Sequence, residues 1–176
     1  MFEEKQILKN TVFEGRVVSV RSDLAELGDG TRVSREVAEH SGGVCIIPVD
    51  WDGAVYCVRQ FRYALMRELL ELPAGRLEPG EDPESCAVRE LSEETGLIPG
   101  AMVSLGAMYT SPGWSTETLY LYLATDLTQG AAHPDPGEFL SVERIPMDAL
   151  LDQVIKGEIQ DGKTIAGILK AAQYLN

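Results

Sequence analysis

The stretch of sequence that decides the fold is Glu81-Asp82-Pro83-Glu84-Ser85-Cys86-Ala87-Val88-Arg89-Glu90-Leu91-Ser92-Glu93, in the middle of the chain. Pro83 behind Asp82 predicts a helix start, and Gly96 predicts its end. At about 100° per residue, Glu90, Glu93 and Glu94 fall within one narrow arc of this helix. Another part of its surface is shared by Ala87, Val88, Leu91 and Thr95. The pattern is that of an amphipathic helix whose polar face gathers carboxylates, which suits Mg²⁺ or Mn²⁺.

A solvated acidic face is the ordinary alternative for such a cluster, with Arg89 pairing with Glu93 at i,i+4. Two features favour a cation instead. Glu93 and Glu94 lie in the last turn, where they oppose the negative end of the helix dipole, and Glu90 repels Glu94 at i,i+4. Each effect costs a few tenths of a kcal/mol. Several small costs accepted at one place indicate a functional site, here a site for a cation.

The spacing of the glycines, glutamates and arginine in and around this helix resembles a known family motif. Gly75, five residues, Glu81, seven residues and then Arg89-Glu90-Leu91-Ser92-Glu93-Glu94-Thr95-Gly96-Leu97 are similar to the Nudix box without a departure. The resemblance implies an α/β (α+β) fold, a Nudix-type α/β/α sandwich with a mixed sheet between helices. It also implies hydrolysis of a nucleoside diphosphate linked to another group.

Further motifs resemble the ADP-ribose pyrophosphatase branch of that family. They are Arg35-Glu36-Val37, Arg59-Gln60-Phe61-Arg62, Glu71-Leu72-Pro73-Ala74-Gly75, Tyr109-Thr110-Ser111-Pro112-Gly113, Gly137-Glu138-Phe139 and Asp161-Gly162-Lys163-Thr164. This resemblance implies a small N-terminal antiparallel β appendage over residues 1–39, a Nudix hydrolase domain over 40–176, and a homodimer whose subunits exchange the N-terminal strands and share the substrate pocket.

The resemblance also assigns roles to residues of the box. Metal binding falls to Glu90, Glu94 and the backbone carbonyl of Ala74, with Glu93 and Glu81 close by as catalytic candidates. Hydrolysis of a pyrophosphate requires this chemistry, because charge on the phosphate oxygens must be neutralised and a water must be activated. Arg89 is expected to orient the helix carboxylates, and Gly75 to let the loop turn.

The candidate general base is Glu138, in the loop His133-Pro134-Asp135-Pro136-Gly137-Glu138. It matches the family position proposed to activate the attacking water, whereas an ordinary solvated loop acid is the alternative. Rival bases are Asp135, Glu117, Glu143 and the box helix itself.

Substrate contacts are expected from Arg35, Arg62, Gly75, Leu77 and Glu117. Guanidinium groups match phosphate oxygens, so Arg35 and Arg62 fit phosphate or ribose. The alternative for both is an ion pair with a neighbouring acid such as Glu68 or Glu71. Some members of the branch sandwich adenine between tryptophans of the N-terminal strands, and residues 12–39 contain none.

Composition limits the remaining possibilities. With 176 residues, 44% of them hydrophobic, the chain can build one core and a small appendage. A net charge of −13 argues against nucleic acid and anionic membranes as partners. Cys45, Cys57 and Cys86 show no CxxC spacing and are expected to be buried thiols in a reducing compartment. Met1–Lys5 lacks the features of a signal peptide, so a cytoplasmic location is expected.

Turn residues divide the chain into predicted elements. Val12–Ala25 and Thr31–Glu39 are expected to form a hairpin around Gly28-Asp29-Gly30, and Val44–Asp50 and Ala54–Arg59 a second one around Trp51-Asp52-Gly53. Further strands are predicted at 69–73, 101–110, 117–125 and 139–145, and helices at 147–156 and 164–175.

The sequence therefore predicts Mg²⁺-dependent hydrolysis of a nucleotide sugar, with Mn²⁺ as a possible substitute and ADP-ribose, cleaved to AMP and ribose 5-phosphate, as the expected substrate. Another nucleotide sugar, such as GDP-mannose or UDP-glucose, is the alternative substrate. A module that binds ADP-ribose without cleaving it is the alternative from another class, although it would be expected to have lost box carboxylates. The sequence contains no G-x-S-x-G motif, which argues against a serine-hydrolase triad, and no G-x-x-x-x-G-K-[ST] motif, which argues against a P-loop.

Overall fold

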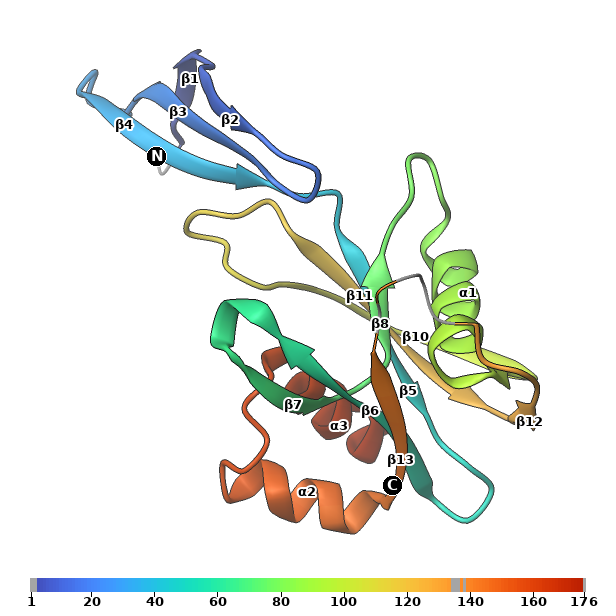
Figure 1. Cartoon of the computed structure of the whole chain (residues 1–176). Coiled ribbons are helices and arrows are strands. Elements are labelled where there is room, and N and C mark those ends of the chain that lie inside the picture. The colour runs from blue at the N-terminus through green and yellow to red at the C-terminus, as the bar shows by residue number, and fades with distance from the viewer. Residues whose placement is uncertain (1–2, 134–136, 138, 176) are drawn as a thin grey trace. The chain divides into compact units, whose positions relative to one another are not determined.

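The structure is a computed structural model that describes residues 3–133, 137 and 139–175 (Figure 1). The chain divides into two compact units. One comprises Met1–Gly42 with Tyr109–Thr118, and the other Gly43–Met108 with Leu119–Asn176.

The first unit is built around one long antiparallel hairpin. Strands β3 (Ser19–Glu26) and β4 (Arg32–Glu39) pair along their whole length, which confirms the hairpin predicted around Gly28-Asp29-Gly30. β1 (Lys5–Leu8) and β2 (Thr11–Glu14) pair with successive parts of β3.

The predicted continuous strand over residues 12–25 is interrupted at Gly15. The Gly15 N–H donates to the Val18 carbonyl oxygen over 3.0 Å and closes a turn between β2 and β3. A Cβ at Gly15 would lie 2.7 Å from the Phe13 ring and 2.9 Å from the Val18 oxygen. The glycine therefore provides the space that this reversal needs.

The segment 109–118 belongs to the same unit because it hydrogen-bonds to the end of β4. The Ala38 N–H donates to the Trp114 oxygen over 2.7 Å, and the Thr116 N–H donates to the Ala38 oxygen over 3.0 Å. These bonds place Glu117 within the first unit.

The second unit contains a mixed sheet with β5 (Gly43–Pro48) near its centre. Its strand order is β10-β11-β5-β8, formed by β10 (Ala101–Tyr109), β11 (Thr118–Thr125), β5 and β8 (Ala74–Arg76). β11 runs parallel to β5 and β8 runs antiparallel. Every residue of β5 is buried, as expected for a strand covered on both faces.

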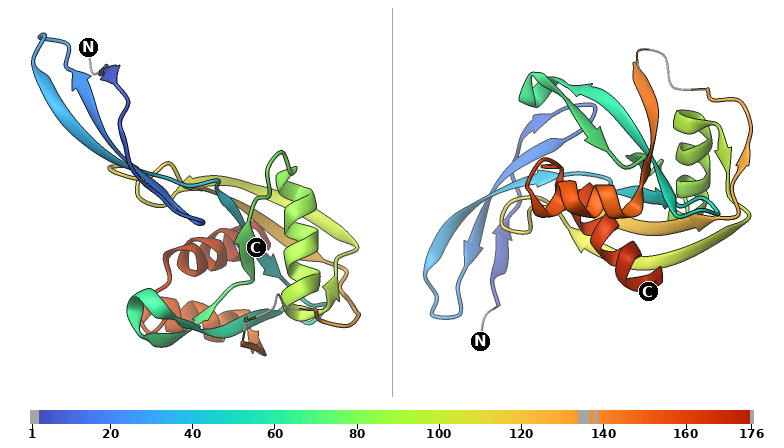
Figure 2. Two further views of the ribbon diagram at one scale, coloured as in Figure 1. Left: turned by 45° about the horizontal axis from the view of Figure 1, so that its top comes forward. Right: turned by 90° about the horizontal axis from the view of Figure 1, so that it is seen from below.

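Helices cover both faces of this sheet, and β5 shows how they are distributed (Figure 2). Cys45 and Ile47 pack in one core with α2 (Met147–Ile155) and α3 (Gly162–Leu175). Val44 and Ile46 point to the opposite face and pack in a second core with α1 (Pro83–Thr95). The predicted α/β/α arrangement around a mixed sheet is confirmed.

A second sheet carries β6 away from β5. β6 (Ala54–Arg62) pairs antiparallel with β7 (Arg67–Glu71) and with β13 (Leu140–Pro146), and a short helix η1 (Tyr63–Leu65) joins β6 to β7. The predicted reversal around Trp51-Asp52-Gly53 is present, because Val49 forms an antiparallel bridge with Val55 and the Asp50 N–H donates to the Ala54 oxygen over 2.8 Å. The predicted pairing of the two strands beyond this turn is wrong, because β5 and β6 enter different sheets.

The remaining features agree with the sequence-based predictions. β9 (Leu97–Ile98) pairs with β12 (Thr128–Gln129) beside the end of α1. Cys45, Cys57 and Cys86 are free and buried. In the part of the chain that the structure describes, no helix is both long and apolar enough to cross a membrane.

Candidate active site

Helix α1 presents the box carboxylates, and its ends lie where the sequence predicts. Asp82 is the N-cap, and its side chain accepts a hydrogen bond from the Ser85 N–H over 3.0 Å. Pro83 occupies the first turn, where its missing N–H costs nothing. Gly96 ends the helix in the left-handed conformation, with φ of 74°.

The buried face of α1 differs from the predicted one at three positions. Ala87 and Leu91 are fully buried as expected, whereas Val88 is 36% exposed and Cys86 is buried in its place. Glu94, expected on the polar face, is only 4% exposed. A carboxylate at that depth requires polar partners, since burial without them is costly.

Glu90 and Glu94 both lie against the backbone of β8. Glu94 Oε2 accepts a hydrogen bond from the Ala74 N–H over 3.1 Å. A Cβ at Gly75 would lie 1.8 Å from the Glu90 carboxyl carbon. The φ of Gly75 lies outside the left-handed region, so the expectation that Gly75 permits a turn is wrong. A glycine is needed here because the Glu90 carboxylate occupies the space of a side chain.

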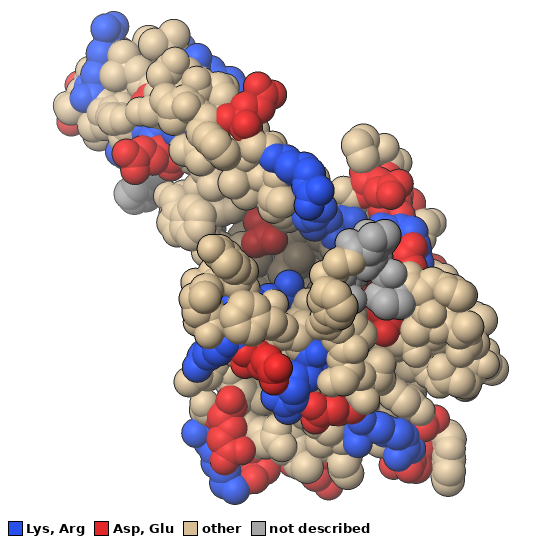
Figure 3. Space-filling model, viewed as in Figure 1, with Lys and Arg blue, Asp and Glu red and all other residues tan. Residues whose placement is uncertain are grey.

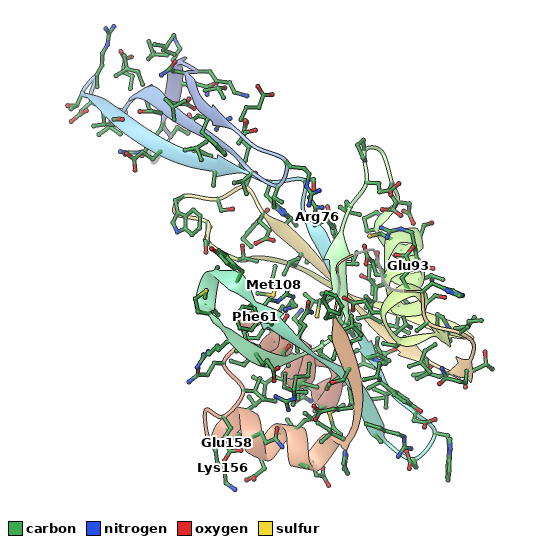
Figure 4. All side chains as sticks on the ribbon, in the orientation of Figure 1. Phe61, Arg76, Glu93, Met108, Lys156 and Glu158 are labelled. Atoms are coloured by element: carbon green, nitrogen blue, oxygen red, sulfur yellow. The ribbon has the colours of Figure 1, made fainter. Side chains whose placement is uncertain are left out.

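Arg89 ties the other acids of the box together. Its Nε and Nη2 donate to the two oxygens of Glu81 over 2.9 and 3.0 Å. Its Nη1 donates to Glu90 over 2.8 Å and to Glu93 over 2.9 Å. The Arg89 hydrogen bonds, helped by the Glu78 N–H, lower the pKa of Glu81 to about 2. Glu93, labelled on α1 in Figure 4, has a half-buried side chain that is 33% exposed.

These oxygen donors fit a hard divalent cation. Carboxylates of Glu90, Glu93 and Glu94 and the Ala74 carbonyl are the ligand types that Mg²⁺ and Mn²⁺ prefer. Within the described residues, no group of three or more His, Cys, Asp and Glu side chains is arranged as a ligand set. Arg89 holds two of these carboxylates in hydrogen bonds, so a cation would compete with the guanidinium for them.

Arg62 belongs to the same unit and pairs with Glu71, one of the two acids considered from the sequence. Its Nε and Nη2 donate to the Glu71 oxygens over 2.7 and 2.6 Å. The pKa of Arg62 is raised chiefly by the Glu71 hydrogen bonds, with further contributions from Asp161 and Glu94.

The other predicted substrate contacts lie in different surroundings. Arg35, on β4, donates from Nε and Nη2 to Glu4 over 2.8 Å each. Glu117 accepts from the Thr110 hydroxyl over 2.6 Å and lies 3.6 Å from His40 Nδ1. Arg35 and Glu117 belong to the first unit. Leu77 belongs to the second and packs, half-buried, against the core beneath α1.

The structure describes only some of the candidate bases. Glu138 and its rival Asp135 lie outside the described residues. Glu143, another rival, lies on β13 and accepts from Arg59 Nε over 2.5 Å.

Sequence reasoning considered Glu71 only as an ion-pair partner of Arg62 and assigned no role to Lys163. The two pair with each other in the second unit, where the Glu71 side chain is buried and that of Lys163 is 12% exposed. A signal was present, because Glu71 interrupts the apolar run Leu69-Leu70-Glu71-Leu72 and Lys163 lies in the motif Asp161-Gly162-Lys163-Thr164.

On the face of the molecule drawn in Figure 3, Lys and Arg are interspersed with Asp and Glu rather than gathered apart from them. With a net charge of −13, attraction of an anionic substrate depends on individual cationic groups such as Arg62.

Comparison with known proteins settles the family. The family model described as NUDIX domain matches residues 39–167, which include the whole box and every described strand of the second unit. The chain belongs to the NUDIX family. The family resemblance of the box is thereby confirmed.

Relatives match over almost the whole chain. An ADP-ribose pyrophosphatase from Bacillus subtilis (strain 168) is 38% identical over 98% of this chain and 92% of its own. A methanol dehydrogenase activator from Bacillus methanolicus is 38% identical over 99% and 94%. A GDP-mannose pyrophosphatase from Enterobacter sp. (strain 638) is 31% identical over 91% of both chains.

A solved structure of similar fold is described as an ADP compounds hydrolase. It superposes with a TM-score of 0.88 at 22% identity and covers 99% of this chain and 96% of its own. At that identity the likeness confirms the fold.

Proposed function

We propose that this NUDIX protein hydrolyses the pyrophosphate bond of a nucleoside diphosphate sugar, with ADP-ribose as substrate and AMP and ribose 5-phosphate as products. The observation that carries the proposal is the convergence of Glu90 and Glu94 on Ala74 and Gly75. Glu94 accepts from the Ala74 N–H, and Glu90 occupies the side-chain space of Gly75. Both glutamates belong to a box helix without substitutions, and both lie against one short backbone segment. This arrangement supports catalysis rather than binding alone.

The proposed cation is Mg²⁺, with Mn²⁺ as a substitute, held by Glu90, Glu94 and the Ala74 carbonyl, with Glu93 nearby. When bound, it supplies charge neutralisation of the pyrophosphate and a lowered pKa of the water that attacks phosphorus. Arg89 positions Glu90 and Glu93 through its hydrogen bonds and keeps Glu81 ionised.

The chain's other side chains bind substrate and move the proton. Arg62 contacts a phosphate through its guanidinium group, which suits phosphate oxygens. Arg35, Leu77 and Glu117 contact the nucleoside or sugar. Glu138 accepts the proton of the attacking water, with Glu93 or Glu81 of the box as the alternative base.

The partner proposed for this chain is a second copy of itself, joined through residues 1–39, with residues 40–176 as the hydrolase domain. Free, buried cysteines support action in the reducing cytoplasm. The charge of −13 supports a small-molecule substrate rather than nucleic acid or an anionic membrane.

The choice of ADP-ribose is supported by the name of the Bacillus subtilis relative, and its alternative by the GDP-mannose pyrophosphatase that matches with lower identity. A panel of ADP-ribose, GDP-mannose and UDP-glucose with Mg²⁺, followed by chromatography of the products, distinguishes them. Faster cleavage of GDP-mannose than of ADP-ribose would replace the proposed substrate. Tight binding of ADP-ribose without products would establish the non-catalytic module.

Substitution of one box acid tests the site itself. We expect Glu94→Gln to lower kcat by about 10²-fold or more, since it removes charge that must act on the pyrophosphate. The matched control is Glu84→Gln, which changes an exposed acid in the first turn of the same helix and should keep full activity. Equal activity of both variants at low Mg²⁺ would contradict the assignment.

A further inference from the structure

Lys163 is a largely buried cation to which the proposed chemistry assigns no role. It lies in the first turn of α3, and its side chain is only 12% exposed. Its ammonium group donates to Glu71 and, over 2.9 Å, to Asp161. Burial by itself lowers the pKa of Lys163, but the Asp161 and Glu71 carboxylates more than offset it and hold the pKa above its usual value. Lys163 is therefore charged at neutral pH.

Glu71 is shared between Lys163 and Arg62. Its side chain is 1% exposed, and Arg62 donates hydrogen bonds to both of its oxygens. A buried carboxylate between two cations is retained only where the geometry satisfies all three groups. Arg62 and Lys163 balance the charges of Glu71 and Asp161, so the cluster as a whole is neutral.

The position of Lys163 is fixed by the start of α3. The Asp161 carboxylate accepts from the Thr164 N–H over 3.0 Å and from its hydroxyl over 2.6 Å, as an N-cap does. The Thr164 hydroxyl in turn accepts from the Leu72 N–H over 2.8 Å. Leu72 directly follows Glu71, so α3 is fastened to the strand end that carries the shared carboxylate.

Arg62 is the member of the cluster that reaches outward. Its side chain is 39% exposed, whereas Glu71 is almost inaccessible. The bonds to Glu71 use one edge of the guanidinium group, formed by Nε and Nη2, which leaves Nη1 directed away from Glu71. The cluster thus fixes one edge of the Arg62 guanidinium on a buried carboxylate and directs the opposite edge away from it.

We propose that Lys163 is a positioning residue. Through Glu71 it fixes the Arg62 guanidinium, and it leaves part of the Arg62 charge unbalanced by Glu71 and so able to attract a phosphate of the substrate. The inference rests on the proposed function, because it assigns Arg62 to phosphate. A carboxylate that also binds Lys163 cannot fully neutralise Arg62. Without Lys163 the cluster carries a net negative charge, and Glu71 pairs with Arg62 alone.

The first test separates binding from turnover. We expect Lys163→Met to raise the KM for ADP-ribose and the Kd for inorganic pyrophosphate with Mg²⁺ by about tenfold or more, the scale of a weakened charge-assisted hydrogen bond. We expect kcat to change by less than about threefold, since the box acids are untouched. Lys163→Arg, which keeps the charge, should restore most of the affinity.

The matched control is Lys156→Met at the end of α2 (Figure 4). Lys156 also pairs with an aspartate, Asp152, but its side chain is 57% exposed. The Lys156→Met variant should leave KM and the pyrophosphate Kd unchanged. If Lys163→Met does not fold, Lys163→Gln provides the same test, because it removes the charge and can still donate to Glu71.

A double-mutant cycle tests whether Lys163 acts through Arg62. In an Arg62→Lys background, loss of Lys163 should change the pyrophosphate Kd by less than about twofold, since coupled residues are not additive. If loss of Lys163 raised the pyrophosphate Kd by the same factor in both backgrounds, the proposal would be overturned, because Lys163 would then act independently of Arg62. An unchanged KM and Kd in Lys163→Met, with a fully active wild type, would also overturn it and leave the proposed function intact. Absence of wild-type turnover on the whole panel would instead refute the proposed function, while the pyrophosphate Kd would still test the positioning.

Discussion

At the scale of single residues, Gly75 couples the backbone of β8 to the box helix. The Glu90 carboxylate lies where a side chain at position 75 would be. We expect Gly75→Ala to lower kcat by about 10²-fold, as removal of an electrostatic group does. Stability should change little, because the overlapping atoms are the end of a flexible side chain that can swing away. Activity assays beside urea unfolding measure both quantities.

Gly162→Ala is the control for that variant. A Cβ there would meet no described atom within 4 Å. It should keep both activity and stability. If Gly75→Ala retained wild-type kcat, the Glu90 carboxylate would not need its present position for catalysis.

Cys57 provides a residue-scale prediction about pH. Burial, with a smaller contribution from Glu143, raises the pKa of its thiol to about 12. The unfolded chain ionises this thiol near its ordinary pKa of about 8.5, so the free energy of unfolding is unaffected below that pH and falls as pH rises toward 12. We expect the free energy of unfolding of the wild type to fall by about 2 kcal/mol more than that of Cys57→Ala between pH 8 and pH 10. Parallel urea curves for the two proteins over this range would contradict the burial of the thiol.

At the scale of elements, α3 packs so closely on the sheet that one of its glycines has no space to spare. A Cβ at Gly167 would lie 2.6 Å from a Leu72 methyl group and 3.2 Å from Ile47. Alanine gains about 1 kcal/mol of helix propensity over glycine, whereas overpacking a core costs about 1–3 kcal/mol. Because Leu72 is fully buried, we expect the packing cost to win and Gly167→Ala to be destabilised by about 1 kcal/mol. Thermal unfolding beside Gly162→Ala measures it, and a more stable Gly167→Ala would show that Leu72 can move.

The elements also show what local sequence can predict. The ends of α1 were predictable because Asp82, Pro83 and Gly96 act on their immediate neighbours. The separation of β5 from β6 was not, since both are apolar and a two-residue period does not say which sheet a strand joins. In the same way, helical spacing placed Glu94 among the polar residues of α1. Its burial depends on β8, because its carboxylate accepts a hydrogen bond from the N–H of Ala74, twenty residues earlier in the sequence.

The site was predictable in part for the same reason. Glu81, Arg89, Glu90 and Glu93 come together as the spacing implies, because they share one helix and the loop before it. The pairing of Glu71 with Lys163 joins residues 92 positions apart, and no local pattern encodes it. The part played by Gly75 required knowing that Glu90 reaches β8.

At the scale of the whole molecule, the N-terminal strands expose apolar side chains that water should not favour. Leu8 is 58% exposed, Val12 57% and Phe13 56%, on strands β1 and β2. Burial of apolar surface contributes about 25 cal/mol per Å², so such a surface favours association. This surface supports the proposed homodimer through residues 1–39.

Sedimentation equilibrium tests that assembly. We expect a mass twice the 19.2 kDa of one chain at micromolar concentration. Phe13→Glu should shift the protein toward monomer and lower activity, because it places a charge in the proposed interface. Trp51→Glu is the control, since Trp51 is 92% exposed in the second unit and should leave the mass unchanged. A wild-type monomer with full activity would show that one chain completes its own site, whereas activity that falls on dilution together with the mass would show that the partner's strands belong to it.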